Sequence, residues 1–110
     1  MNKLISGIQQ IGIGVPNVYE AWKWYKENFG MDIRIFEDDT VAELMFTSTV
    51  GKPHKRHAAL AMHIAGGGGF EIWRYIRRTP EGPSFEVLHG DYGINIAKLK
   101  SPDVERAYTE

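Results

Sequence analysis

The chain has 110 residues, no cysteine and a net charge of -1, and 43% of its residues are hydrophobic. These values exclude a disulfide scaffold, a thiolate zinc site and a cysteine nucleophile, and they favour one globular domain over a disordered chain. The chain has no global positive field to attract nucleic acid, and no apolar stretch long enough for a signal sequence or a bilayer span. We therefore expect a cytoplasmic protein with neither a nucleic-acid nor a membrane partner.

The first predicted strand, residues 8–15, has two different sides. Its apolar side consists of Ile11, Ile13 and Val15, and its polar or bare side of Gln10, Gly12 and Gly14. Glycines inside a strand are typical of a close approach by a ligand or by another backbone. A helix is predicted next, because Asn17 and Glu20 form a capping-box pattern and Gly30 stands where a left-handed C-cap belongs.

Further strands are predicted before residue 79. They cover residues 31–36, with residues 41–47 as an extension or a further strand, then residues 57–65 and residues 70–76. The alternation in residues 57–65 predicts Ala58, Leu60 and Met62 on the core side, and His63 on the opposite side.

The last predicted strand, residues 70–76, again has one apolar side. Phe70 and Ile72 alternate with Glu71, Trp73 and Tyr75. This pattern places Glu71 on the side of the sheet away from the helix. Gln10 of the first strand is predicted on that same side.

A partial internal repeat follows a connector rich in proline and glycine. Residues 91–96 repeat the strand pattern of residues 10–15, and residues 102–108 repeat the helix start at residues 16–22. The predicted units are a first module at 1–78, a connector at 79–89 and the start of a second, incomplete module at 90–110. Either the chain is a fragment of a longer protein, or another chain supplies what is missing.

Two segments carry a resemblance to a known family. They read Ile-Gln-Gln-Ile-Gly-Ile-Gly-Val-Pro at residues 8–16 and Trp-Tyr-Lys-Glu-Asn-Phe-Gly-Met at residues 24–31. Nearly the whole chain resembles the vicinal-oxygen-chelate superfamily, which includes glyoxalase I, bleomycin-resistance proteins and extradiol dioxygenases. The resemblance implies an α+β fold: a βαβββ module of the glyoxalase type plus the first strand and helix start of a second module, forming an open curved sheet.

The resemblance also implies a site. Modules of that superfamily form a cup around a divalent metal, to which each module gives one ligand from its first strand and one from its last. The corresponding metal ligands here are Gln10, Glu71 and Asp91, and the ion would be zinc, nickel, manganese or magnesium. Glu71 would also be the catalytic residue of a lyase or isomerase that acts on a small oxygenated substrate through an enediolate-like intermediate. The residues expected to bind substrate are His63, Trp73 and Tyr75.

This sequence departs from the family pattern at two kinds of position. Gly14 and Tyr75 stand where glutathione-dependent glyoxalases have an Arg and an Asn that bind glutathione, so the glutathione anchors are missing. Gln10 and Asp91 stand where extradiol dioxygenases have His ligands to iron, which argues against oxygen chemistry.

Other interpretations stay open. A strand glutamine such as Gln10 often bonds to a neighbouring backbone, an Asp at the position of Asp91 often caps a turn, and His63 is often solvated in such a place. The protein could also be a metal-free cup that binds a small planar or anionic ligand on Trp73 and Tyr75, as resistance proteins do. A third possibility is an inactive partial domain that pairs with another chain. The expected partners are therefore a small molecule and either a second copy of the chain or a missing C-terminal module.

Overall fold

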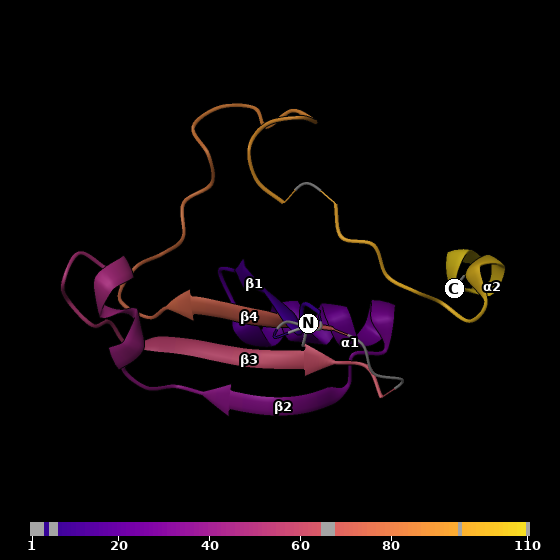
Figure 1. The fold of residues 1–110 in the computed structure, drawn as a ribbon, viewed down its shortest axis with the longest axis horizontal. Coiled ribbons are helices and arrows are strands. Elements are labelled where there is room, and N and C mark those ends of the chain that lie inside the picture. The colour runs from indigo at the N-terminus through magenta and orange to yellow at the C-terminus, as the bar shows by residue number, and fades with distance from the viewer. Residues whose placement is uncertain (1–3, 5–6, 65–67, 95, 110) are drawn as a thin grey trace.

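A computed structural model describes residue 4 and residues 7–64, 68–94 and 96–109, which form an α+β fold with one open sheet (Figure 1). The elements in chain order are β1 (Gln10–Gly14), α1 (Val18–Phe29), β2 (Ile33–Asp38), the 3-10 helix η1 (Glu43–Ser48), β3 (Arg56–Met62), β4 (Gly69–Tyr75) and α2 (Val104–Thr109). The strand order is β1-β4-β3-β2, in which β1 is parallel to β4 and the other neighbours are antiparallel. The predicted α+β class and the open curved sheet are confirmed.

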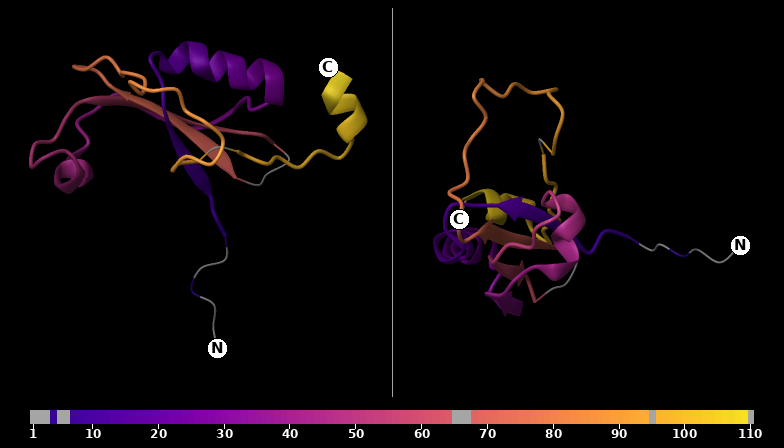
Figure 2. Two further views of the ribbon diagram at one scale, coloured as in Figure 1. Left: turned by 90° about the horizontal axis from the view of Figure 1, so that it is seen from above. Right: turned by 90° about the vertical axis from the view of Figure 1, so that its left-hand side faces the viewer.

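The two faces of the sheet have different surroundings (Figure 2). Helix α1 lies across one face, which we call the covered face. The opposite face, which we call the open face, has η1 at one end of it. Because strand side chains alternate between faces, this one-sided packing decides which residues are available to a ligand.

Both ends of α1 follow the signals in the sequence. The side-chain oxygen of Asn17 accepts hydrogen bonds from the backbone N–H groups of Tyr19 at 3.0 Å and Glu20 at 3.3 Å. At the other end Gly30 has a φ of 60°, and its N–H donates to the carbonyl of Lys26 at 3.0 Å. A left-handed residue of this kind ends a helix at little cost only when it is glycine, so the predicted helix boundaries are confirmed.

The core lies between α1 and the covered face. Val18 of α1 packs with Ala59, Ala61, Phe70 and Ile72 of the sheet, and none of these residues is more than 6% exposed. The half-buried residues that complete this layer include Ile11, Ile13, Val15, Ala21, Trp22 and Tyr25. The predicted apolar sides of the first and last strands are therefore confirmed.

The predicted core side of residues 57–65 is wrong. Ala59 and Ala61 pack beneath α1, whereas Ala58 and Leu60 pair with Trp73 and Glu71 on the open face. Both sides of β3 are apolar, so alternation alone could not identify the covered one. The small alanine side chains under α1 allow the helix to approach the sheet closely, and this explains the observed orientation.

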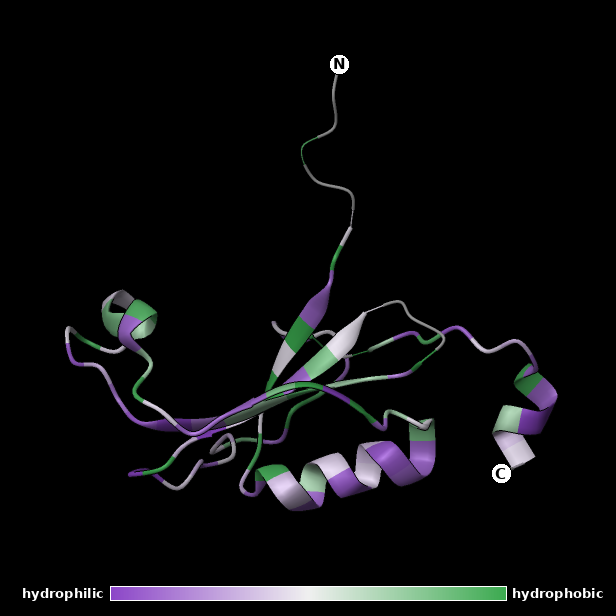
Figure 3. Cartoon of the chain, turned by 90° about the horizontal axis from the view of Figure 1, so that it is seen from below, coloured by the Kyte–Doolittle hydropathy of each residue, from purple (hydrophilic) through white to green (hydrophobic). Residues whose placement is uncertain are grey.

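Two predicted strands are also absent from the described residues. Residues 41–47 form only an isolated bridge, between Val41 and Lys55, and then enter η1, where Leu44 is 99% exposed. The hydrophobic (green) segments of η1 lie apart from α1 (Figure 3). Residues 91–94 and 96 form no strand, and Asn95 lies outside the described residues. Among the described residues neither segment pairs with β1 or β2, the edge strands of the sheet, and a strand without a neighbour leaves its backbone groups unpaired. The predicted second helix start is present, because Asp103 accepts a hydrogen bond from the N–H of Arg106 at 2.9 Å.

Strand β2 contains a bulge that controls its side-chain orientation. Its pairing with β3 shifts between Arg34, opposite Ala61, and Phe36, opposite Leu60, so that Ile35 has no partner. After the shift, Glu37 lies opposite Ala59 on the covered face, and Asp38 faces the open side.

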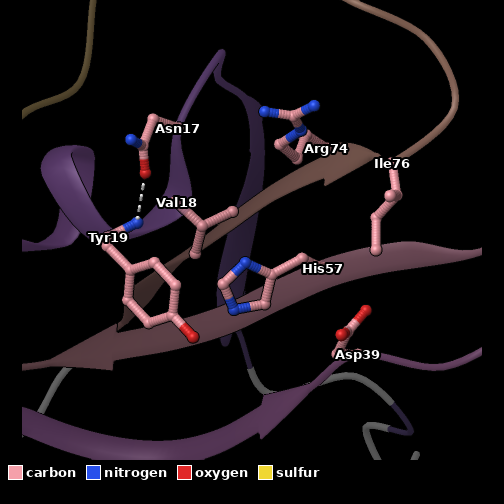
Figure 4. Close-up of a pocket in the computed structure, with 7 residues that line it drawn as sticks. All are labelled: Asn17, Val18, Tyr19, Asp39, His57, Arg74 and Ile76. Atoms are coloured by element: carbon pink, nitrogen blue, oxygen red, sulfur yellow. Dashed lines mark hydrogen bonds between the residues drawn. The ribbon is translucent and has the colours of Figure 1, made fainter.

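Glu37 connects this edge strand to the rest of the covered face. One carboxylate oxygen lies 2.9 Å from Nε2 of His57 in β3, and the other accepts from Arg34 at 2.6 Å. These hydrogen bonds, that of His57 first, lower the pKa of Glu37, and a hydrogen bond to Glu37 raises the pKa of Tyr19. Tyr19 and His57 border a shallow cavity of about 340 Å³ beside the start of α1 (Figure 4).

Replacement of Glu37 is expected to destabilise the protein in a pH-dependent way. A carboxylate whose pKa is lowered on folding stabilises the protein above its unfolded pKa of about 4.3, and this stabilisation is lost as the pH falls through the folded value. Glu37→Gln should therefore lower the free energy of unfolding by about 1–2 kcal/mol at pH 7, and by less at pH 3. Urea unfolding at both pH values measures the difference. Glu27→Gln is the control, because Glu27 is 60% exposed and pairs only with Lys23 at 3.8 Å. Equal losses at both pH values would contradict the assignment.

Candidate ligand and metal site on the open face

Gln10 and Glu71 are in contact on the open face, although they are 61 positions apart in the sequence. The parallel register sets Gly12 of β1 beside Glu71 of β4. Gln10 precedes Gly12 by two residues and therefore points to the same face as Glu71. The side-chain amide Nε2 of Gln10 donates to Oε2 of Glu71 at 2.6 Å. The two side chains that the sequence assigned to one side of the sheet therefore meet there.

Arg56 binds the other oxygen of the same carboxylate. Its Nη1 donates to Oε1 of Glu71 at 3.0 Å, and its Nη2 lies 3.7 Å from Oδ2 of Asp38. The side chains of Arg56 and Glu71 are only 22% and 17% exposed. The guanidinium thus lies between two carboxylates on the open face, at the start of β3.

Neither Arg56 nor Asp38 is among the site residues that the sequence predicts. Arg56 follows the cations Lys52 and Lys55, and Asp38 lies between Glu37 and Asp39, so local charge alone does not mark either residue as part of a site. The available signal was the alternation of β3, because Arg56 has the same parity as Ala58 and Leu60. That signal was lost when this side of β3 was assigned to the core.

Ala58 provides the space in which Arg56 lies. The register pairs Arg56 with Tyr75, Ala58 with Trp73 and Leu60 with Glu71, so the guanidinium reaches Glu71 by crossing the row of Ala58. Ala58 itself is 0% exposed. A longer side chain at this position would occupy the path of the arginine.

Trp73 and Tyr75 extend the open face beyond Glu71. Their ring centroids are 5.0 Å apart, with an angle of 81° between the planes. The indole Nε1 of Trp73 lies 3.4 Å from the point that a Cβ at Gly12 would occupy, so the bare backbone of β1 accommodates this ring. The hydroxyl of Tyr75 lies 3.8 Å from the sulfur of Met45, so η1 borders this end of the face. Both aromatic residues therefore lie on the side that the sequence predicted.

His63 and Asp91 occupy places other than those expected. The ring of His63 lies beside Gly30, with Cδ2 3.0 Å from the position of a Cβ there, at the end of the helix on the covered face. Asp91 belongs to a turn in which its carboxylate accepts from the N–H of Leu88 at 2.9 Å. His63 is therefore not on the cup side, and Asp91 does not begin a strand but closes a turn.

Gln10 and Glu71 fit a divalent metal in the kind of donor they provide but not in number. An amide oxygen and a carboxylate are suitable ligands for hard and borderline ions, and rotation of the Gln10 amide would turn its oxygen toward such an ion. Within the described ranges, however, no cluster of three or more His, Asp or Glu residues could hold a metal. The remaining ligands of a complete site would have to come from elsewhere.

Comparisons with protein-family models, with curated proteins and with solved structures each found no match to this chain. Of the helices in the described part of the chain, none combines the length and the apolar character that crossing a membrane requires.

The ion pair between Arg56 and Glu71 is expected to contribute to stability. Since both side chains are largely buried, a double-mutant cycle with Arg56→Met and Glu71→Gln should give a coupling free energy of about 1–2 kcal/mol in urea unfolding. The matched control is the exposed pair of Lys23 and Glu27, which are 72% and 60% exposed and should show a coupling near zero. Equal coupling in the two cycles would show that Arg56 is not held by Glu71 in solution.

Proposed function

We propose that the open face is one half of the site of a metal-dependent lyase or isomerase of the glyoxalase type. The observation that carries the proposal is the 2.6 Å contact between Gln10 in the first strand and Glu71 in the last, on the face that α1 does not cover. These strands and these two donor types are the ones that the family resemblance implies. The substrate would be a small molecule with oxygens on neighbouring carbons.

Each residue of the face has a definite part in this proposal. When bound, a divalent ion would supply Lewis acidity that stabilises the negative charge developing on the substrate oxygens. Gln10 and Glu71 would hold the ion, and Glu71 would accept the proton from the carbon next to the carbonyl. Trp73 and Tyr75 would pack against the substrate and exclude water.

A second βαβββ module would supply the remaining ligands. We propose that it comes either from another copy of the chain or from a C-terminal module, and that the protein acts in the cytoplasm. Support for a second sheet comes from the two-donor set itself, because zinc, nickel, manganese and magnesium each take four or more ligands.

The metal-free alternative is supported by a different observation. Arg56 already neutralises Glu71 at 3.0 Å, and Trp73 and Tyr75 provide an aromatic surface on the same face. With the carboxylate neutralised, this aromatic surface suits a small planar ligand, which the protein could bind without catalysis.

Titration with Ni²⁺ and with a small hydroxamate, which carries two adjacent oxygens, separates the two functions. For the enzyme half-site we expect wild-type protein to bind Ni²⁺ and to bind the hydroxamate only when Ni²⁺ is present. Glu71→Gln should weaken Ni²⁺ binding by at least about tenfold, because it removes the charged ligand. Glu27→Gln, a change of the same chemistry on the exposed side of α1, should leave it unchanged. If Ni²⁺ does not bind, and Glu71→Gln leaves hydroxamate binding unaltered, the lyase proposal is wrong.

A further inference from the structure

We propose that Arg56 is an internal counter-ion that competes with a divalent cation for Glu71, and that Asp38 is its alternative partner. This inference rests on the proposed function, because it concerns access of an ion to the Gln10 and Glu71 pair. It goes beyond that function in assigning to Arg56 and Asp38 the control of cation affinity. Arg56 acts through Glu71 and is in this sense a positioning residue.

Arg56 contacts the carboxylates of Glu71 and Asp38 unequally. The 3.0 Å contact of Nη1 with Glu71 is a full hydrogen bond, whereas the 3.7 Å separation of Nη2 from Asp38 is longer than one. The guanidinium is therefore bound to Glu71 and only close to Asp38. A small rotation of the side chain away from Glu71 would complete the bond to Asp38.

The path of the Arg56 side chain along β3 sets where its guanidinium can reach. Arg56 crosses the row of Ala58, a residue whose side chain ends at Cβ and is 0% exposed. Nε of Arg56 is buried and has no hydrogen-bond partner in the described part of the chain, so no bond at this atom holds the guanidinium in its present position. Since Nη1 lies 3.0 Å from Glu71 and Nη2 lies 3.7 Å from Asp38, a change of partner needs only a short movement of the guanidinium.

Charge repulsion between a divalent cation and Arg56 favours this movement. A cation with two charges and a guanidinium bound to one carboxylate repel each other twice as strongly as two single charges at the same distance. The side chains of Arg56 and Glu71 are largely shielded from water, which weakens the screening of that repulsion. Entry of the ion next to Glu71 would therefore drive Arg56 to Asp38, whose side chain is 33% exposed and carries the compensating charge.

The test measures the affinity of the chain for Mn²⁺ from the electron paramagnetic resonance signal of the free ion, without any activity assay. Arg56→Met removes the competing charge and should bind Mn²⁺ at least about tenfold more tightly than wild type. Arg56→Lys retains a charge that can reach Glu71 and should stay closer to wild type. Lys55→Met is the matched control, since Lys55 pairs with Asp39 at 3.3 Å and its loss alters net charge equally. That variant should change the affinity by less than about threefold.

Removal of Asp38, the alternative partner of Arg56, should lower the affinity for Mn²⁺. Asp38→Asn confines Arg56 to Glu71 and should weaken Mn²⁺ binding more than Asp39→Asn, which removes the same charge from the Lys55 pair. In the Arg56→Met background the difference between these two variants should disappear, because no guanidinium remains to be relocated.

The possible results distinguish the inference from the proposed function. If wild type and Arg56→Met bind Mn²⁺ equally, Arg56 is no competitor, while the half-site stands. If Arg56→Met binds more weakly, Arg56 supports the ion through Glu71 and the inference is wrong in sign. If no variant binds Mn²⁺ at millimolar concentration, both the inference and the metal-dependent function fail.

Discussion

Packing of a single helix on one face of the sheet is the constraint from which the rest of the structure follows. Once Val18 is buried against Ala59, Ala61, Phe70 and Ile72, the alternation of each strand fixes the residues that remain on the other side. Gln10, Glu71 and Arg56 are on the open face for this reason. The set of side chains on the open face is thus a consequence of where the core forms.

The parallel pairing of β1 with β4 adds the second requirement, because it brings the two ends of the βαβββ unit next to each other. Gln10 and Glu71 contact each other only because Gly12 is level with Glu71 in this register. The carboxylate then has one oxygen on a neutral amide and the other on a guanidinium.

The features that the sequence predicted well have strong local causes. Asn17 and Gly30 define α1 through caps that operate within a few residues, and the first and last strands each have one clearly apolar side. Their orientation was enough to place Gln10 and Glu71 together. The features that failed depend on distant partners: β3 is apolar on both sides, so only the position of α1 decides that Ala59, and not Leu60, faces the helix. Arg56 was missed for that same reason. The turn at Asp91 was an alternative that the sequence left open, and the local pattern could not decide it, because a strand forms only where a neighbouring edge exists.

The unpaired Ile35 in β2 determines which acidic residue serves which side of the molecule. In a regular strand, with Ile35 paired, the later residues would be out of phase by one position, so Glu37 would lie on the side of Arg56 and Asp38 on the side of His57. Two neighbouring carboxylates would then exchange their cationic partners without any change in their identity. The bulge in this edge strand, as much as the residue type at any one position, therefore sets the electrostatic difference between the two faces.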